Sequence, residues 1–213
     1  RFAAEAGRDA FGGGLQIGDE LLAALGDAVG QRPAGRLEGD PSAVISSVAI
    51  DSRHVAAGGL FAALVGEQQD GHDYFPEALA AGASAVLCTR DVAAPRIVVP
   101  DVAVALGLLA RAVHDRLPDL VTVGVTGSSG KTTTKDLIAH ILRAHGSTVA
   151  PPGSLNNELG VPLTVFRCDD TTRFLVVEMG ARGLGHISYL CGIAPPQVGV
   201  VLNVGSAHVG EFG

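Results

Sequence analysis

The residues best suited to chemistry lie in one stretch, VTVGVTGSSGKTTT, from Val121 to Thr134. An apolar, β-branched run stops there at a glycine-rich loop, and apolar residues at helical spacing follow the loop. A strand, a glycine loop and a helix in this order are typical of a phosphate-binding loop, whose backbone N–H groups and helix dipole hold the anion. We therefore predict that nucleotide is bound by Gly127, Ser128, Ser129, Gly130, Lys131, Thr132 and Thr133.

Within this loop the lysine and the threonine have distinct expected roles. Lys131 would reach the β- and γ-phosphates as a catalytic cation, and the Thr132 hydroxyl would bind Mg²⁺. The loop departs from the longer pattern G-x-x-x-x-G-K-[ST], because Val125 stands where that pattern has its first glycine. The alternative is an ordinary strand–turn–helix with a chance lysine. The Lys-Thr pair and its flanking elements favour a nucleotide site.

Two more polar side chains follow buried strands later in the chain. Glu178 ends the apolar run FLVV, and His208 comes shortly after the run VGVVL. Ligands of parallel α/β sheets sit beyond the carboxyl ends of the strands, so both side chains should lie near the loop. We predict Thr132, Glu178 and His208 as metal ligands. The alternatives are a solvent-facing Glu178 and a structural His208.

Other candidate residues have two possible readings each. Asn156 and Asn157 could donate to oxyanions at a reacting centre, or they could serve only as turn residues. Ser52 and Arg53 follow a strand and could clasp a phosphate, because arginine offers a two-pronged donor. They could equally be a surface pair at a strand end. The residue types alone do not decide between these alternatives.

The elements that position these residues predict an α/β fold. Strands alternate with helices after residue 118, which indicates a mainly parallel sheet. We place a domain boundary there, with residues 1–117 and 118–213 on its two sides and residues 1–17 as an irregular lead-in. Expected strands lie at 44–50, 60–65, 85–88, 97–99, 121–126, 148–150, 174–178 and 198–202. Expected helices lie at 18–29, 75–81, 187–193, after the loop, and after a capping Asp101, and 33–41 is expected to be a connection.

Composition narrows the class of protein. The chain has 213 residues, 47% of them hydrophobic and 17% charged, as in a compact globular protein. A net charge of −7 argues against a general nucleic-acid binder. The three cysteines are widely spaced, which suggests a reducing, cytoplasmic location. We find no apolar run long enough to span a bilayer, and the absence of an initiating Met suggests a chain cut or processed at its front.

Several segments together resemble the Mur ligases, which add amino acids to the UDP-muramoyl precursor of peptidoglycan. That family uses the short G-x-x-G-K-[ST] loop, so TGSSGKT fits it. Within the family, the sequence is most similar to the members that add D-alanyl-D-alanine. The similar segments are Asp51–Arg53, LFAALVGEQQDGHDYF from Leu60, GSLNNELGVPLT from Gly153, VVEMGA from Val176 and NVGSAHVGEFG from Asn203.

This resemblance implies an ATP-dependent acid–amino-acid ligase. ATP would phosphorylate the terminal carboxylate of UDP-MurNAc-tripeptide, and the amine of D-alanyl-D-alanine would attack the acyl phosphate. The implied UDP-substrate residues are Ser52, Arg53, Asp70, Gly71, His72 and Asp73. The implied residues of the reacting centre are Lys131, Asn156, Asn157 and His208, with ATP and Mg²⁺ as cofactors and Glu178 and His208 on the metal. The implied fold is a small α/β substrate domain followed by part of a P-loop domain.

The resemblance also implies parts that this sequence does not contain. Family members continue beyond the histidine motif to a carbamylated lysine, the rest of the ATPase domain and an acceptor-binding domain. We therefore expect a fragment without ligase turnover. The rival readings are another Mur-type or folylpolyglutamate-type ligase, a P-loop kinase or GTPase, and a non-catalytic UDP-ligand-binding module. The third residue of the substrate peptide, diaminopimelate or lysine, is left open.

Overall fold

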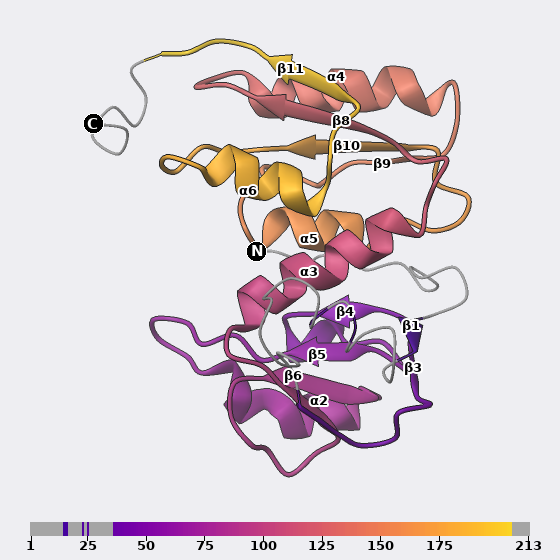
Figure 1. Ribbon diagram of the computed structural model, residues 1–213, viewed down its shortest axis with the longest axis vertical. Coiled ribbons are helices and arrows are strands. Elements are labelled where there is room, and N and C mark those ends of the chain that lie inside the picture. The colour runs from indigo at the N-terminus through magenta and orange to yellow at the C-terminus, as the bar shows by residue number, and fades with distance from the viewer. Residues whose placement is uncertain (1–14, 17–22, 24, 26–35, 206–213) are drawn as a thin grey trace. The chain divides into compact units, whose positions relative to one another are not determined.

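The chain forms two compact units, Arg1–Ala112 and Val113–Gly213. The computed structural model describes residues 15–16, 23, 25 and 36–205. Figure 1 shows both strands and helices in each unit. The predicted mixed α/β class with mostly parallel sheets is confirmed. The helix expected at 18–29 lies largely outside the described residues.

The first unit is built on a five-stranded sheet with the order β2-β7-β6-β5-β4. Neighbouring strands run parallel, except that β2 pairs antiparallel with β7. A two-stranded antiparallel pair, β1 with β3, completes the strands of this unit. The strands are β1 (Leu15–Gln16), β2 (Arg36–Glu38), β3 (Val44–Ile45), β4 (Val48–Ala49), β5 (Leu60–Ala62), β6 (Ala85–Cys88) and β7 (Arg96–Val98).

Short helices follow several of these strands. The core beneath them contains buried Phe61, Ala78 and Val86. Asp101 caps α3 as expected, since its Oδ1 accepts hydrogen bonds from the N–H groups of Ala103 and Val104. The helices are η1 (Ser52–His54), η2 (Gly71–Tyr74), α2 (Phe75–Ala80) and α3 (Val102–Asp115), whose last residues belong to the second unit.

Three expectations for the first unit are wrong. The single strand expected at 44–50 is two short strands, β3 and β4, which belong to different sheets. The segment 33–41 is not only a connection, because β2 lies within it and its Arg36 pairs with Asp91 and Glu38. The strand expected at 60–65 ends at Ala62, and Val65 is 65% exposed. Val65 instead forms an isolated bridge with Asp70, so apolar character continues past the end of the sheet into a turn. Hydrophobic runs give poor strand ends for this reason.

The second unit is built on a four-stranded parallel sheet with the order β11-β8-β10-β9 (Figure 1). The register places Glu178, the last residue of β10, beside Val125 of β8. The carboxyl ends of these two strands therefore meet at one edge, as the sequence predicts for a parallel sheet. The strands are β8 (Val121–Thr126), β9 (Thr148–Val149), β10 (Phe174–Glu178) and β11 (Val198–Val201).

Three helices accompany this sheet: α4 (Lys131–Arg143), α5 (Gly160–Val165) and α6 (His186–Ile193). The helix α4 packs Ala139 against Val123, Val125 and Val176 of the sheet. The helix α5 was not predicted from the sequence, and Pro162 lies inside it. That proline is in the first turn, where its missing N–H has no intrahelical partner in any helix, so the helix tolerates it.

The buried face of α4 differs from the apolar pattern in its sequence. Leu137 and Ile141 are each 60% exposed, whereas Lys135 is fully buried. The pattern of apolar residues thus predicted a helix correctly but not the whole of its inward face. Among the described residues, no helix combines the length and the apolar composition needed to cross a membrane.

Candidate functional site

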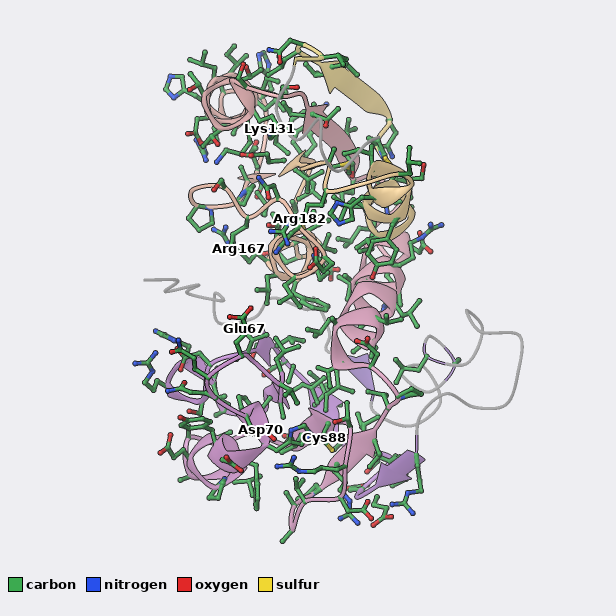
Figure 2. The ribbon with its side chains drawn as sticks, turned by 90° about the vertical axis from the view of Figure 1, so that its left-hand side faces the viewer. Glu67, Asp70, Cys88, Lys131, Arg167 and Arg182 are labelled. Carbon is green, nitrogen blue, oxygen red and sulfur yellow. The ribbon has the colours of Figure 1, made fainter. Side chains whose placement is uncertain are left out.

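The phosphate loop joins the end of β8 to the start of α4. Gly127 has φ +145° and Gly130 has φ +78°, backbone conformations that favour glycine. The helix begins at Lys131, which is labelled in Figure 2. The Lys131 ammonium folds back over the loop and donates to the Gly127 carbonyl over 2.6 Å. The Lys131 ammonium is therefore held over the curved backbone of the phosphate loop.

The first turn of α4 presents backbone donors beyond this loop. Thr134 is the first residue of α4 whose N–H has a backbone acceptor, and it donates to the Gly130 carbonyl over 3.0 Å. The N–H groups of Lys131, Thr132 and Thr133 have no backbone acceptor among the residues that the structure describes. Free N–H groups at the positive end of a helix dipole attract an anion such as a phosphate.

A buried carboxylate lies beside this first turn. Glu178 is 1% exposed, and its Oε2 accepts from the Thr132 hydroxyl over 2.9 Å. Its Oε1 accepts from Asn156 Nδ2 over 2.8 Å. Both partners are neutral, and within the described part of the chain no lysine, arginine or histidine forms an ion pair with Glu178. A buried charge in proteins is normally paired or bound to a metal, so this site has the character of a cation site.

The donor set fits Mg²⁺ in particular. Magnesium prefers hard oxygen ligands and usually binds through one or two carboxylates, with water and phosphate oxygens completing its shell. Thr132 and Glu178 supply a hydroxyl and a carboxylate at hydrogen-bond distance. The described residues contain no group of three or more His, Cys, Asp or Glu arranged for a metal. His208, the third predicted ligand, lies outside the described residues, so its role stays a prediction.

The structure separates the two asparagines that the sequence left undecided. Asn156 faces the site through its bond to Glu178, and its carbonyl accepts from the Gly180 N–H over 2.8 Å. Asn157 turns away to the start of α5, where its Oδ1 accepts from the N–H groups of Leu159, at 3.3 Å, and Gly160, at 2.8 Å. Asn157 therefore has helix-capping chemistry in this structure.

Asn203 contacts the phosphate loop, and sequence reasoning did not single it out. Its Oδ1 accepts from the N–H groups of Ser128 and Ser129, each over 3.1 Å. Its Nδ2 donates to the Ser129 carbonyl over 3.2 Å and lies 3.3 Å from the Ser129 hydroxyl. Asn203 comes just after β11, so the strand-end rule that pointed to Glu178 could have found it.

Lys135 was also missed. It lies one turn after Lys131, and its buried ammonium donates to the carbonyls of Pro151, over 2.7 Å, and Gly153, over 2.9 Å. Asp136 is its ion-pair partner at 2.8 Å. These bonds attach the segment that leads to Asn156 onto α4. A lysine within an amphipathic pattern is usually read as exposed, so the sequence carried no signal for this contact.

A cavity of about 930 Å³ opens in the first unit, within the size range of small-molecule sites. Of the six residues predicted to bind substrate there, three line it: Ser52, Arg53 and Gly71. Tyr74 lines it as well, and so does Phe61, whose side chain is buried in the core.

The polar groups of this cavity are already bonded within the chain. Arg53 donates to both oxygens of Asp51, from Nε over 2.9 Å and from Nη2 over 2.6 Å. This pairing holds the pKa of Asp51 well below its usual range. Ser52 donates to Glu77 over 3.0 Å. The Arg53 side chain is still 78% exposed, so its remaining donors are accessible to an anionic ligand.

Asp70 and His72 form a network that holds the turn before α2 (Figure 2 labels Asp70). The Thr89 N–H donates to His72 Nε2 over 3.0 Å, so the ring proton is on Nδ1, which faces Asp70 Oδ1 at 2.6 Å. Asp70 also accepts from Arg90 over 2.7 Å. His72 is 2% exposed, and neither residue lines the cavity. Asp73, which is exposed, does not line it either. Substrate contacts by Asp70, His72 and Asp73 stay predictions.

Comparison with known proteins matches both units. The model of the Mur ligase family, catalytic domain, matches residues 44–114, and that of the Mur ligase middle domain matches residues 125–213. The UDP-N-acetylmuramoyl-tripeptide--D-alanyl-D-alanine ligase of Mycobacterium tuberculosis is 50% identical over 193 residues, which cover 80% of this chain and 38% of that protein. The ligase of the same name from Escherichia coli is 39% identical over 181 residues, 84% of this chain and 40% of that protein.

Solved structures show the same relationship. A crystal structure of MurF from Acinetobacter baumannii has a TM-score of 0.80 and 34% identity, and the match covers 90% of this chain and 42% of that one. MurF ligase from Thermotoga maritima in complex with ADP has a TM-score of 0.70 and 40% identity, over 76% of this chain and 38% of that one. The chain thus spans about two fifths of the length of these relatives. With two domain models of one family on its two units, the chain belongs to the Mur ligase family.

Proposed function

We propose that this chain provides the UDP-substrate domain and the phosphate loop of an ATP-dependent ligase that joins D-alanyl-D-alanine to UDP-MurNAc-tripeptide. The names of the relatives support this substrate pair, and the ADP complex of the Thermotoga maritima relative supports ATP as the nucleotide. We assign residues 1–117 to the substrate domain and 118–213 to the first part of the ATP domain. A cytoplasmic location is part of the proposal, and the free thiols of all three cysteines agree with it.

The observation that carries the proposal is the contact between Thr132 and Glu178 at the start of α4. Mg²⁺ bound there would neutralise charge on the phosphates of ATP. Lys131 needs only to exchange its bond to Gly127 for one to a phosphate oxygen, because its ammonium already lies over the loop. Asn156, which is bonded to Glu178, would present its amide to the γ-phosphate or to the substrate carboxylate.

These groups would act mainly by position and charge. A carboxylate and a phosphate repel each other in water, so a site that joins them must offset negative charge and hold the reacting atoms in line. The cation of Lys131 and the free N–H groups of the first turn of α4 would do the first. The tether of Asn156 to Glu178 would do the second. In this step the γ-phosphoryl group of ATP would pass to a carboxylate oxygen of the tripeptide and leave ADP. The amine of D-alanyl-D-alanine would then attack the carbonyl carbon of the acyl phosphate and release phosphate.

The cavity of the first unit is the proposed site of the UDP group. Tyr74, which is half-buried, offers an aromatic face on which a nucleobase can stack. Arg53 offers an exposed guanidinium, which binds phosphate oxygens in a two-pronged way. Ser52 would join it if its hydroxyl rotated from Glu77. Ser52 and Arg53 come shortly after β4, beyond the carboxyl end of a parallel strand, where such ligands bind.

Calorimetry on the 213-residue chain tests the proposal with two ligands and a crossed pair of variants. The ligands are UDP-MurNAc-tripeptide and ATP with Mg²⁺. Lys131→Met should weaken ATP binding about tenfold or more and leave the UDP ligand unaffected, because a charge-assisted phosphate contact contributes roughly 1.5–3 kcal/mol. Arg53→Met should weaken binding of the UDP ligand and leave ATP binding unaffected. Each variant is therefore the control for the other.

The proposal is wrong if the chain binds GTP as tightly as ATP, or if it binds neither UDP-MurNAc-tripeptide nor ATP. Tight binding of the UDP ligand without any ATP binding would favour the alternative of a non-catalytic UDP-ligand-binding module. UDP-MurNAc without its peptide is a further ligand for comparison. Equal affinity for it would show that this chain recognises the UDP-sugar and not the peptide.

A further inference from the structure

Asn203 bonds the phosphate loop with every polar atom of its side chain. One amide oxygen accepts from two successive N–H groups, and one amide nitrogen faces two oxygens of Ser129. The Asn203 carbonyl also accepts from the Ser128 N–H over 3.2 Å. The Ser128 hydroxyl in turn accepts from the Gly205 N–H over 2.8 Å. The loop is thus tied to the segment after β11 by both backbone and side chain.

We propose that Asn203 is a positioning residue that fixes the phosphate loop in the shape that binds nucleotide. This inference rests on the proposed function of the loop as the ATP site. Asn203 itself would not touch the phosphates. It would act through Ser128 and Ser129, whose N–H groups it occupies, so that the loop stays curved and the later donors face the ligand.

An asparagine suits this role because the loop offers donors and acceptors side by side. Aspartate would keep the acceptor, but it would lose the donor to Ser129 and place a negative charge beside an anion site. Alanine would lose both. The backbone at Gly127 leaves little room for a larger residue. A Cβ on Gly127 would lie 3.1 Å from Leu202 Cβ and 3.2 Å from the backbone nitrogen of Asn203. The glycine and the asparagine together allow this close approach.

The same bonds have a second reading that predicts the opposite effect. The Asn203 oxygen could occupy N–H groups that a phosphate oxygen takes when ATP binds, and would then compete with the nucleotide. In that case removal of the side chain strengthens nucleotide binding. The contacts favour positioning, because Nδ2 also donates to the loop carbonyl of Ser129, and a phosphate oxygen, which only accepts hydrogen bonds, could not take the place of that donor.

The test uses Asn203→Ala and Asn203→Asp in the 213-residue chain, with Val204→Ala as the matched control. Val204 is 93% exposed and adjacent, so its truncation changes the segment without touching the loop bonds. ADP with Mg²⁺ is titrated by calorimetry. Loss of the amide should weaken ADP binding about tenfold, as expected for two or three neutral hydrogen bonds, and the aspartate should weaken it further. The melting temperature should stay near that of the unmodified chain, because Asn203 is exposed.

Amide hydrogen exchange without nucleotide provides the readout that does not depend on binding. Exchange at Ser128 and Ser129 should accelerate in Asn203→Ala and stay unchanged in Val204→Ala. If Asn203→Ala binds ADP as tightly as the unmodified chain, or more tightly, the inference is overturned. If the unmodified chain binds no ADP, the proposed function fails, but exchange still decides about Asn203. Acceleration supports the clamp on the loop, and unchanged exchange overturns it.

Discussion

The Thr132 hydroxyl and the Glu178 carboxylate are 46 residues apart in the sequence, yet they lie 2.9 Å apart in the structure. The strand register explains the contact. Because β10 runs parallel to β8 with Glu178 beside Val125, the carboxylate reaches the edge of the sheet where the loop turns into α4. A hydroxyl on the first turn of that helix then meets it. The contact between Thr132 and Glu178 therefore follows from the parallel pairing of β8 and β10.

Glu178→Gln should abolish the contribution of Mg²⁺ to ATP binding. The amide keeps the size of the side chain, and the Thr132 hydroxyl can rotate to suit it, but the negative charge is lost. We expect the affinity for ATP with Mg²⁺ to fall about tenfold or more, and the affinity measured with a chelator to change little. Calorimetry with and without EDTA measures the difference.

The matched control for this substitution is Asp170→Asn, which removes an exposed carboxylate from the same unit. It should leave both affinities unchanged. The metal-free stability of Glu178→Gln should equal or exceed that of the unmodified chain, since a buried charge with only neutral partners is costly. An ATP affinity that still responds to Mg²⁺ in Glu178→Gln would refute the assignment of Glu178 to the metal.

The contact between Thr132 and Glu178 was within reach of sequence reasoning, and other parts of the site were not. Lys131, Thr132 and Glu178 each end or follow a strand, and a parallel sheet brings strand ends together. By contrast, the choice between Asn156 and Asn157 depends on which of two adjacent side chains a turn directs inward. Hydrophobic patterns carry no information about that. It becomes visible only with the backbone in place.

The same substitution should change the stability of the protein by different amounts at the two lysines of the chain. Lys135→Met leaves the buried Pro151 carbonyl without its donor, at a cost of roughly 1–3 kcal/mol for an unsatisfied buried acceptor. Lys131→Met removes a partly exposed ammonium, and the Gly127 carbonyl can turn to water. Urea unfolding should therefore show a loss of stability for Lys135→Met and almost none for Lys131→Met. Equal stability of the two variants would contradict this account of Lys135.

Asn156→Ala and Asn157→Ala should likewise separate function from stability. Asn157 caps α5 through two N–H groups, and loss of such a cap costs about 1 kcal/mol. Asn156 bonds Glu178, so its loss should alter ATP binding with Mg²⁺ while the unfolding free energy changes less. Thermal unfolding and calorimetry on both variants check the two effects. If Asn157→Ala weakens ATP binding more than Asn156→Ala, the structural distinction between them is wrong.

In the first unit, only some of the residues predicted from the sequence line the cavity. The predicted residues Ser52 and Arg53 line the cavity because they come shortly after β4, beyond the end of a parallel strand. The stretch from Asp70 to Asp73 is polar and looks equally suited to a ligand. In the structure Asp70 and His72 are instead hydrogen-bonded to each other. His72 also accepts from Thr89, and Asp70 also accepts from Arg90. A polar turn that braces its own fold has the same composition as one that binds a ligand, and only the contacts distinguish them.

The network around Asp70 should make the stability of the first unit depend on pH in a defined window. Hydrogen bonds from the His72 backbone and ring, and from Arg90, lower the pKa of Asp70 to about 2. In the unfolded chain an aspartate titrates near about 3.9. A lowered pKa means that the carboxylate stabilises the fold above about pH 4, and that this contribution is lost as the pH falls towards 2.

Asp70→Asn isolates this effect, because it retains an oxygen for the His72 N–H but carries no charge. The unmodified chain should be more stable than the variant at pH 7, and the difference should shrink as the pH falls from about 4 to about 2. Asp73→Asn is the control, since Asp73 is 72% exposed and lies 3.6 Å from Arg90. Its effect should be small at every pH. Urea unfolding between pH 2 and pH 7 makes the measurement, and a difference between Asp70→Asn and the unmodified chain that stays constant with pH would show that the charge of Asp70 does not stabilise this turn.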